Sequence, residues 1–153
     1  MINKNVINKK SILITGGTGS FGNAMAEYLS KNYSPKKIII FSRDELKQSN
    51  MMQKFPQDNF RFFIGDVRSL DRLDMAMRNV DIVIHAAAMK QVEISEYNPL
   101  ECIKTNIIGA ENIINAAIKN NVKKVIALSS DKAVSPLNLY GASKLASEKL
   151  LNI

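Results

Sequence analysis

Two side chains near the end of the chain are spaced so that they could act together as a proton acceptor. Tyr140 and Lys144 lie four residues apart, which places both on one face of any helix that contains them. A tyrosine with a pKa near 10 is a poor base at neutral pH, but a neighbouring ammonium group favours the phenolate. The pair could then take a proton from a substrate hydroxyl while hydride passes to a bound nicotinamide. An ordinary amphipathic helix shows the same spacing, so the segments upstream decide between the two readings.

A glycine-rich segment directly follows an apolar run and opens a helical segment. Gly16, Gly19 and Gly22 have a GxxGxxG spacing that allows a tight turn, close approach of a pyrophosphate and close packing of helix on strand. The helix amino terminus also offers unpaired N–H groups to phosphates. A tight turn alone could use these glycines, but the strand before them and the helix after them favour a dinucleotide site. Its predicted contacts are Gly16, Thr18, Gly19, Ser20, Phe21 and Gly22.

The end of the second predicted strand indicates which dinucleotide binds. An acidic residue there would bind the ribose 2′-hydroxyl of NAD. This chain instead has Ser42 and Arg43, with Lys47 one helical turn later. A hydroxyl and two cations suit a 2′-phosphate, which arginine can bind through two parallel hydrogen bonds. Asp44 precedes Glu45 and is interpreted as a helix N-cap. We therefore predict NADP as the cofactor.

Two further strand ends are placed to meet the cofactor. Asp66 and Val67 follow the third predicted strand and could contact the adenine ring, although a polar turn fits equally well. The fourth strand ends in small side chains, as a backbone lying close to a cofactor requires, and these are Ala86, Ala87 and Ala88. His85, just before them, is interpreted as a satisfied core histidine rather than an acid or base.

The segments that must position these residues alternate between short β-branched runs and amphipathic helices. The predicted strands are 11–15, 37–42, 60–65, 81–86 and 122–128. Nearly continuous Ile/Val runs are typical of parallel strands buried on both faces. Ser69 marks one helix start, and Asn98 before Pro99 marks a helix that runs at regular spacing to Asn120 and Asn121. The alternation predicts an α/β, Rossmann-type, doubly wound parallel sheet of about five strands in one domain, 1–153.

The composition narrows the class of protein. The chain has 153 residues, 46% of them hydrophobic and 23% charged, which is typical of one globular domain. No apolar run approaches the roughly 20 residues of a membrane span, and residues 1–10 carry no apolar stretch of signal-peptide length. We therefore predict a cytoplasmic protein without a membrane partner. The single cysteine, Cys102, excludes an internal disulfide and a multi-cysteine metal site, and no metal is predicted.

The net charge of +7 raises the question of a nucleic-acid partner. The lysine pairs 9–10, 36–37 and 123–124 each precede an apolar run, so they should gather at one edge of the sheet, where the preceding helices end. Helix dipoles favour cations there. No aromatic residues interleave with these lysines to stack on bases. We therefore predict no nucleic-acid partner.

The chain resembles the extended short-chain dehydrogenase/reductase superfamily, and within it the inverting UDP-N-acetylglucosamine 4,6-dehydratases of pseudaminic acid synthesis. The resemblance lies in seven segments: TGGTGSFG, SRDELKQ, GDVR, HAAAMK, EYNPLECIKTNIIGAEN, SSDKA and YGASK. The glycine motif and Tyr-x-x-x-Lys mark only the superfamily. The Asp131–Lys132 pair and the segment 97–100 point to the dehydratases. Retaining dehydratases carry Asp-Glu at this place, so Lys132 favours the inverting type.

The resemblance implies a role for each reacting side chain. Tyr140 would deprotonate the C4 hydroxyl as hydride passes to NADP⁺, with Lys144 supporting Tyr140 and Ser130 holding the C4 oxygen. Lys132 would then remove the C5 proton, and Asp131 would protonate the departing C6 hydroxyl. Hydride would return to C6, and reprotonation from the opposite face would invert C5. From spacing alone, a surface salt-bridging turn at 131–132 is equally plausible.

The resemblance also implies the partners of the protein. UDP-N-acetylglucosamine would be the substrate, contacted by Lys90 and Ser130, and the product would serve bacterial surface or flagellar glycan synthesis. Family members run to about twice this length, so the chain resembles their N-terminal half, with the strand 122–128 left as an exposed edge. The full-length parent is expected to be a homo-oligomer. The alternatives are a nucleotide-sugar 4-epimerase or another extended short-chain oxidoreductase, and a catalytically inactive NADP-binding fragment.

Overall fold

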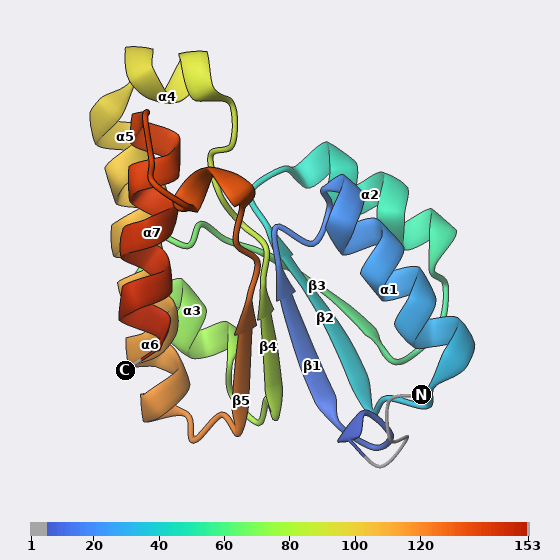
Figure 1. Ribbon diagram of the computed structural model, residues 1–153. Helices are drawn as coiled ribbons and strands as arrows, with labels where there is room; N and C mark the ends of the chain where they lie inside the picture. The colour runs from blue at the N-terminus through green and yellow to red at the C-terminus, as the bar shows by residue number, and fades with distance from the viewer. Residues whose placement is uncertain (1–5, 153) are drawn as a thin grey trace.

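The computed structural model describes residues 6–152, in which one parallel sheet lies between layers of helices (Figure 1). The strands are β1 (Ser11–Thr15), β2 (Lys37–Ser42), β3 (Phe60–Ile64), β4 (Ile82–His85) and β5 (Lys124–Ala127). All pairs are parallel, in the order β3-β2-β1-β4-β5, so the winding reverses at β1 as in doubly wound folds. This confirms the predicted Rossmann-type fold with five strands. Residues 1–5 and 153 of the predicted domain lie outside the described residues.

Alternating side chains of the strands fill two cores, one on each face of the sheet. Ile12 and Ile14 pack with Ala26 of α1 (Ser20–Asn32) and Met51 of α2 (Glu45–Lys54). Leu13 points to the opposite face, where α3 (Leu70–Ala76) and α6 (Gly109–Lys119) cover the sheet (Figure 1). The helix α7 (Leu139–Leu151) packs against α6. Burial on both faces explains the nearly continuous apolar runs of these strands.

Several helix ends lie at the residues predicted to cap them. The Asp44 side chain accepts a hydrogen bond from the Lys47 backbone N–H at 2.9 Å, and Ser69 accepts one from the Arg72 N–H. Both are N-caps that satisfy donors left free in the first turn. α6 ends at Lys119, with Asn120 as its C-cap, as predicted.

The expected helix from Pro99 to Asn120 forms, but it contains a π-helical stretch. Its segments are α5 (Pro99–Ile103), the π-helical η2 (Lys104–Ile108) and α6, and a separate short helix, α4 (Val92–Tyr97), precedes them. Asn98 is the N-cap of α5 but makes no side-chain cap bond; its amide donates instead to the Ile94 carbonyl. The π segment widens the helix where the Asn106 side chain bonds elsewhere in the molecule. Such single-turn π insertions are frequent at functional sites.

The strand β5 forms one edge of the sheet. β5 is an edge strand that pairs only with β4, and Ile126 in its middle is 47% exposed. The strand begins later than the predicted residue 122, because the Val122 N–H bonds back to the Ala117 carbonyl near the end of α6. The described lysines of the predicted pairs do lie at the amino edge, where Lys36 N–H also donates to the Lys10 carbonyl.

Among residues 6–152, no helix is long and apolar enough to cross a membrane.

Candidate active site

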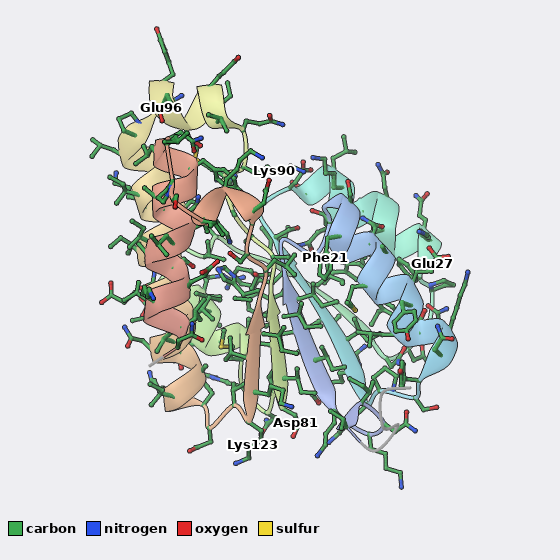
Figure 2. The ribbon with its side chains drawn as sticks, in the orientation of Figure 1. Phe21, Glu27, Asp81, Lys90, Glu96 and Lys123 are labelled. Carbon is green, nitrogen blue, oxygen red and sulfur yellow. The ribbon has the colours of Figure 1, made fainter. Side chains whose placement is uncertain are left out.

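A cavity of about 520 Å³ lies at the carboxyl edge of the sheet and is lined by residues that follow all five strands. Figure 2 shows Phe21 and Lys90 at this edge, and Asp81 and Lys123 at the opposite one. The cavity brings together every residue predicted to bind the cofactor, and also Lys90. These lining residues are Gly16, Thr18, Gly19, Ser20, Phe21, Gly22, Ser42, Arg43, Lys47, Asp66, Val67, Ala86, Ala87, Ala88, Lys90, Tyr140 and Lys144.

The glycine turn forms the floor of this cavity. Gly16 has φ +64°, a conformation that side chains disfavour, and a Cβ on it would lie 2.9 Å from the Ala87 nitrogen. Gly19 is the N-cap of α1 and offers no side chain, and the first turn of α1 holds no acidic residue. The N–H groups at the start of this 13-residue helix are therefore free to bind an anion. This arrangement fits the pyrophosphate of a dinucleotide.

His85 lies below the cavity wall and is buried, at 3% exposure. Its Nδ1 is 2.7 Å from the hydroxyl oxygen of Thr15. Burial, assisted by the positive charge of Lys144, lowers the pKa of His85 to about 4. The interpretation of His85 as a satisfied core histidine is confirmed.

The end of β2 places the predicted cations at the rim. The Arg43 side chain is 62% exposed, and its guanidinium is 3.7 Å from the Asp66 carboxylate. Lys47 Nζ is 3.4 Å from the Asp44 carboxylate. Ser42 is nearly buried, and its hydroxyl accepts a hydrogen bond from Gln48 Nε2 at 3.0 Å. Its position is thus fixed, whereas the two cations are held only by exposed ion pairs and can turn toward a ligand.

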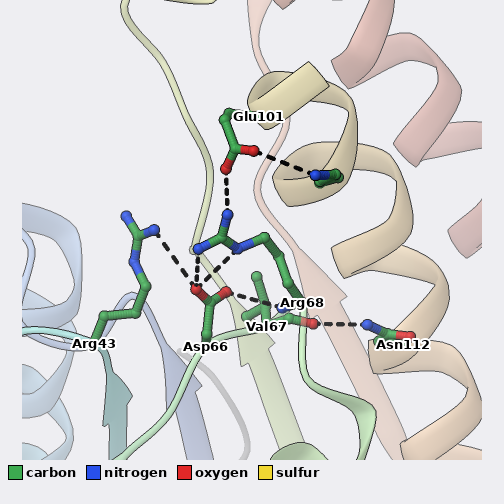
Figure 3. A network of polar contacts seen from close by, with 7 residues as sticks. Arg43, Asp66, Val67, Arg68, Glu101 and Asn112 are labelled. Atoms are coloured by element: carbon green, nitrogen blue, oxygen red, sulfur yellow. Dashed lines mark hydrogen bonds and ion pairs between the residues drawn. The ribbon is translucent and has the colours of Figure 1, made fainter. Parts of the chain in front are cut away.

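Asp66 belongs to a charged network that links β3 to α5 (Figure 3). Its Oδ2 accepts hydrogen bonds from Arg68 Nε at 2.9 Å and Arg68 Nη2 at 2.7 Å. Arg68 also pairs with Glu101. Burial acts to raise the pKa of Asp66, but the Arg68 bonds and the Arg43 charge outweigh it and hold that pKa below its usual value. Asp66 therefore stays ionised, with Arg68 as its main partner and Arg43 only loosely attached.

Tyr140 and Lys144 lie on the inner side of α7 and line the cavity together. Asn138 caps the helix by accepting a hydrogen bond from the Gly141 N–H at 2.8 Å. Lys144 is 7% exposed, and its ammonium group donates to the Leu128 carbonyl at the end of β5. Burial lowers the pKa of Lys144, and the charge of Glu148 opposes this effect. A backbone oxygen thus holds the ammonium group of Lys144, which follows Tyr140 by one helical turn.

The remaining predicted catalytic residues follow β5 but do not line the cavity. Ser130 is the N-cap of a short 3₁₀ turn, η3 (Asp131–Ala133), and its hydroxyl is 3.1 Å from Asp131 Oδ1. Asp131 and Lys132 form an ion pair of 3.5 Å, with side chains 86% and 49% exposed. The Ser130 hydrogen bond and the Lys132 charge lower the pKa of Asp131. This exposed ion pair matches the salt-bridging turn that spacing alone makes equally plausible.

Asn106 is a buried polar residue that sequence reasoning missed. Its side chain accepts from the Met89 N–H at 2.8 Å and donates to the Met89 carbonyl at 2.9 Å. The same amide donates to Ser143 Oγ of α7 at 2.9 Å. It therefore joins η2, the loop after β4 and the helix of Tyr140. Its asparagine side chain within an apolar helical stretch was the signal that could have found it.

Six residues that line the cavity were also missed: Phe41, Asp44, Gly65, Thr105, Leu128 and Ser129. Most of them end or follow a strand, so position rather than residue type marks them. Among residues 6–152, no group of three or more His, Cys, Asp or Glu could hold a metal ion. Cys102 is buried in α5, with its thiol 3.6 Å from Ser143 Oγ.

Comparison with known sequences identifies close relatives. A family model described as "Polysaccharide biosynthesis protein" matches residues 12–153. The chain is 65% identical over 145 residues to the UDP-N-acetylglucosamine 4,6-dehydratase (inverting) of Campylobacter jejuni, covering 95% of this chain and 43% of that protein. It is 53% identical over 144 residues to the UDP-glucose 4-epimerase of Rickettsia akari, covering 92% of this chain and 42% of that protein. The chain thus spans less than half the length of these curated relatives.

Solved structures share the fold. Pen from Bacillus thuringiensis matches with a TM-score of 0.91 and 46% identity, over 94% of this chain and 45% of that one. The UDP-glucose 4-epimerase from Bifidobacterium longum, in complex with NAD⁺ and UDP, matches with a TM-score of 0.79 and 27% identity, over 93% of this chain and 48% of that one. The comparison therefore extends to proteins whose structures hold a nicotinamide dinucleotide.

Proposed function

This chain belongs to the polysaccharide biosynthesis protein family, and we propose that it carries the cofactor site and reacting side chains of an NADP-dependent, C5-inverting UDP-N-acetylglucosamine 4,6-dehydratase. The observation that carries the proposal is the high identity to an enzyme of that name across nearly the whole chain. The cavity supports it, because the glycine turn, the cationic end of β2 and Tyr140 all line one space. The proposal includes action in the cytoplasm, a homo-oligomeric parent and a product used in surface or flagellar glycan synthesis.

NADP is proposed from the order of groups along the cavity. The pyrophosphate would lie against Gly16, Gly19 and the start of α1. The 2′-phosphate would lie between Ser42, Arg43 and Lys47, two of which are cations with exposed side chains. The Arg68 side chain donates two hydrogen bonds to the Asp66 carboxylate, so the Arg43 guanidinium remains available to a phosphate. Asp66 and Val67 would meet the adenine, and the small residues 86–88 the nicotinamide side.

The chemistry begins at C4 of the sugar. When bound, NADP⁺ accepts hydride from C4 and later returns it to C6. Tyr140 would take the proton of the C4 hydroxyl, and Ser130 would hold the C4 oxygen. The Lys144 ammonium group, held by the Leu128 carbonyl, would support Tyr140 in this step. The resulting C4 ketone makes the proton on C5 acidic enough to be removed.

Elimination would then be performed from η3. Lys132 would take the C5 proton, and Asp131 would protonate the C6 hydroxyl so that it leaves as water. A proton delivered to C5 from the opposite face, after hydride has returned to C6, would invert that centre. These steps need a neutral Lys132 and a protonated Asp131, whereas the two side chains form an exposed ion pair in this structure. We infer that the bound sugar, with Lys90 at the cavity rim, must separate and desolvate this pair.

The proposal is tested by incubating the purified protein with UDP-N-acetylglucosamine and NADP⁺ in deuterated water and following the sugar by NMR. The expected product is a 4-keto-6-deoxy hexosamine, inverted at C5 and deuterated there. An unmodified sugar would refute the proposed activity. If the protein left the sugar unmodified but still bound NADP⁺ tightly, the result would favour the alternative of a catalytically inactive, NADP-binding chain.

A second candidate is a nucleotide-sugar 4-epimerase. The observation that favours it is the identity of more than half of the aligned residues to a protein named UDP-glucose 4-epimerase. An epimerase needs Tyr140 and Lys144 but has no use for a proton-transferring pair at Asp131 and Lys132. The same NMR experiment distinguishes the two, because an epimerase gives the C4 epimer with its C6 hydroxyl retained.

A further inference from the structure

Gly141 lies where two segments of the proposed catalytic machinery touch. It follows Tyr140 in α7 and is buried in the helix. A Cβ on Gly141 would overlap the carbonyl oxygen of Lys132 and would lie 3.0 Å from the Pro136 Cβ. The overlap is with backbone, which cannot turn away as a flexible side chain can. The η3 turn can therefore lie this close to α7 only because residue 141 has no side chain.

The contact fixes the separation of two sets of reacting groups. Tyr140 lines the cavity from α7, whereas Asp131 and Lys132 lie on η3. Ala133, at the end of η3, is also buried, at 4% exposure, and η3 packs against α7. Any side chain at position 141 would push the Lys132 backbone outward while leaving Tyr140 in its helix. The distance between the η3 turn and Tyr140 would then increase.

We propose that Gly141 is a positioning residue that sets the distance between the η3 turn and Tyr140, and so couples oxidation at C4 to elimination across C5 and C6. The proposal rests on the proposed function, because it uses the roles given there to Tyr140, Asp131 and Lys132. It adds that one methyl group introduced at position 141 can slow elimination while leaving oxidation nearly unchanged. Oxidation depends on Tyr140 in its own helix and on Ser130, which precedes the turn, whereas elimination depends on where Asp131 and Lys132 of the turn lie.

The test compares Gly141→Ala with the wild type, in separate measurements of the two steps. Rapid-mixing absorbance of the reduced nicotinamide reports C4 oxidation, and NMR reports the dehydrated product. A displacement of about 1 Å can slow a reaction step about 100-fold. We therefore expect product formation to fall about 100-fold, while C4 oxidation changes less than about 3-fold and reduced cofactor accumulates. A purely structural loss would lower both steps together, so an equal loss of both, or no change in either, overturns the proposal.

Ala142→Gly is the matched control. Ala142 is the next residue of α7 and is exposed, so this variant changes helix propensity without touching η3. It should keep both steps at wild-type rates. Should Gly141→Ala fail to fold, Ala133→Gly, which loosens η3 by removing one buried methyl group, takes its place with the same expected separation of steps.

A crystal structure of Gly141→Ala separates this proposal from the proposed function. If the wild-type protein neither reduces NADP⁺ nor dehydrates the sugar, the proposed function fails, and the structure alone decides the positioning role. The expected result is an η3 turn displaced from α7 by about 1 Å, with Tyr140 and Lys144 unmoved. An η3 turn in its wild-type place would overturn the positioning role even if the enzyme were active.

Discussion

Thr15 Oγ1 lies 2.7 Å from His85 Nδ1, and this buried hydrogen bond joins the ends of the adjacent strands β1 and β4. The same oxygen accepts hydrogen bonds from the N–H groups of Ala86 and Ala87, at 3.2 and 3.3 Å. Because its oxygen already accepts from two donors, the Thr15 hydroxyl acts as the hydrogen-bond donor to Nδ1. The ring proton of His85 therefore lies on Nε2, and the imidazole is neutral. Thr15 thereby holds the loop of small residues against the glycine turn.

The neutral imidazole predicts how stability depends on pH. The pKa of His85 is about 4 in the folded chain, against 6.5 for a free histidine, so the unfolded chain binds more protons between these values. The free energy of unfolding should therefore fall by about 3 kcal/mol as pH falls from 6.5 to 4. Chemical denaturation across this range measures it. His85 is the only histidine, so His85→Gln should flatten the slope, and an equally steep slope in that variant would contradict the assignment.

The proposed preference for NADP is tested at Arg43. Arg43→Ala should weaken binding of NADP⁺ by about 10- to 100-fold, because a charge-assisted hydrogen bond contributes about 1.5–3 kcal/mol. Binding of NAD⁺, which lacks the 2′-phosphate, should change less than about 3-fold. Isothermal titration calorimetry with both dinucleotides gives the ratio. Arg61→Ala is the control, because Arg61 is exposed on β3 and lies outside this cavity; equal losses for both dinucleotides in Arg43→Ala would rule out a 2′-phosphate contact.

The proposed base for C5 is tested by Lys132→Ala. Half of the Lys132 side chain is exposed and, among residues 6–152, it forms an ion pair with Asp131 alone, so the variant should fold with little loss of stability. Dehydration should fall by at least about 100-fold, since general-base catalysis contributes at least that factor. Reduction of NADP⁺ by the sugar should continue, because it depends on Tyr140. Retention of full dehydratase activity would assign the C5 proton to another group.

The buried amide of Asn106 should contribute strongly to stability. Asn106→Ala leaves both the N–H and the carbonyl of Met89 without their partner, and should lower the free energy of unfolding by about 2–4 kcal/mol. Asn112→Ala is the matched control, a buried asparagine in α6 whose amide donates only to the Val67 carbonyl at 3.0 Å. Its loss should be about 1–2 kcal/mol. Urea denaturation of the two variants measures the difference, and equal losses would show that the Met89 bonds contribute no more than the single Val67 bond.

The sequence predicted most of what depends on local patterns. The strands 11–15 and 37–42 have the bounds predicted for them, because each is an uninterrupted apolar run between polar turns. Most of the predicted residues that line the cavity follow a strand, and parallel strands bring their carboxyl ends to one edge.

What the sequence did not predict depends on contacts between distant segments. The π segment exists where Asn106 reaches Met89 and Ser143, neither of which is adjacent to it in sequence. The place of η3 outside the cavity follows from its packing against α7, which no motif encodes. The role of Gly141 is also invisible in the spacing of Tyr140 and Lys144, because it depends on a carbonyl from the preceding turn.

The central place of β1 has a consequence for how the chain folds as it is synthesised. Leu13 pairs with Ile39 on one side, but Thr15 meets His85 only 70 residues later on the other. Closing the longer loop costs roughly 1 kcal/mol more in chain entropy. The part of the cavity lined by residues from Gly16 to Val67, where the adenosine half of the cofactor is proposed to bind, can therefore assemble on the ribosome before the segment that carries Tyr140 has been made. This part of the cavity would fold early, and the part that contains Tyr140 would close over it last.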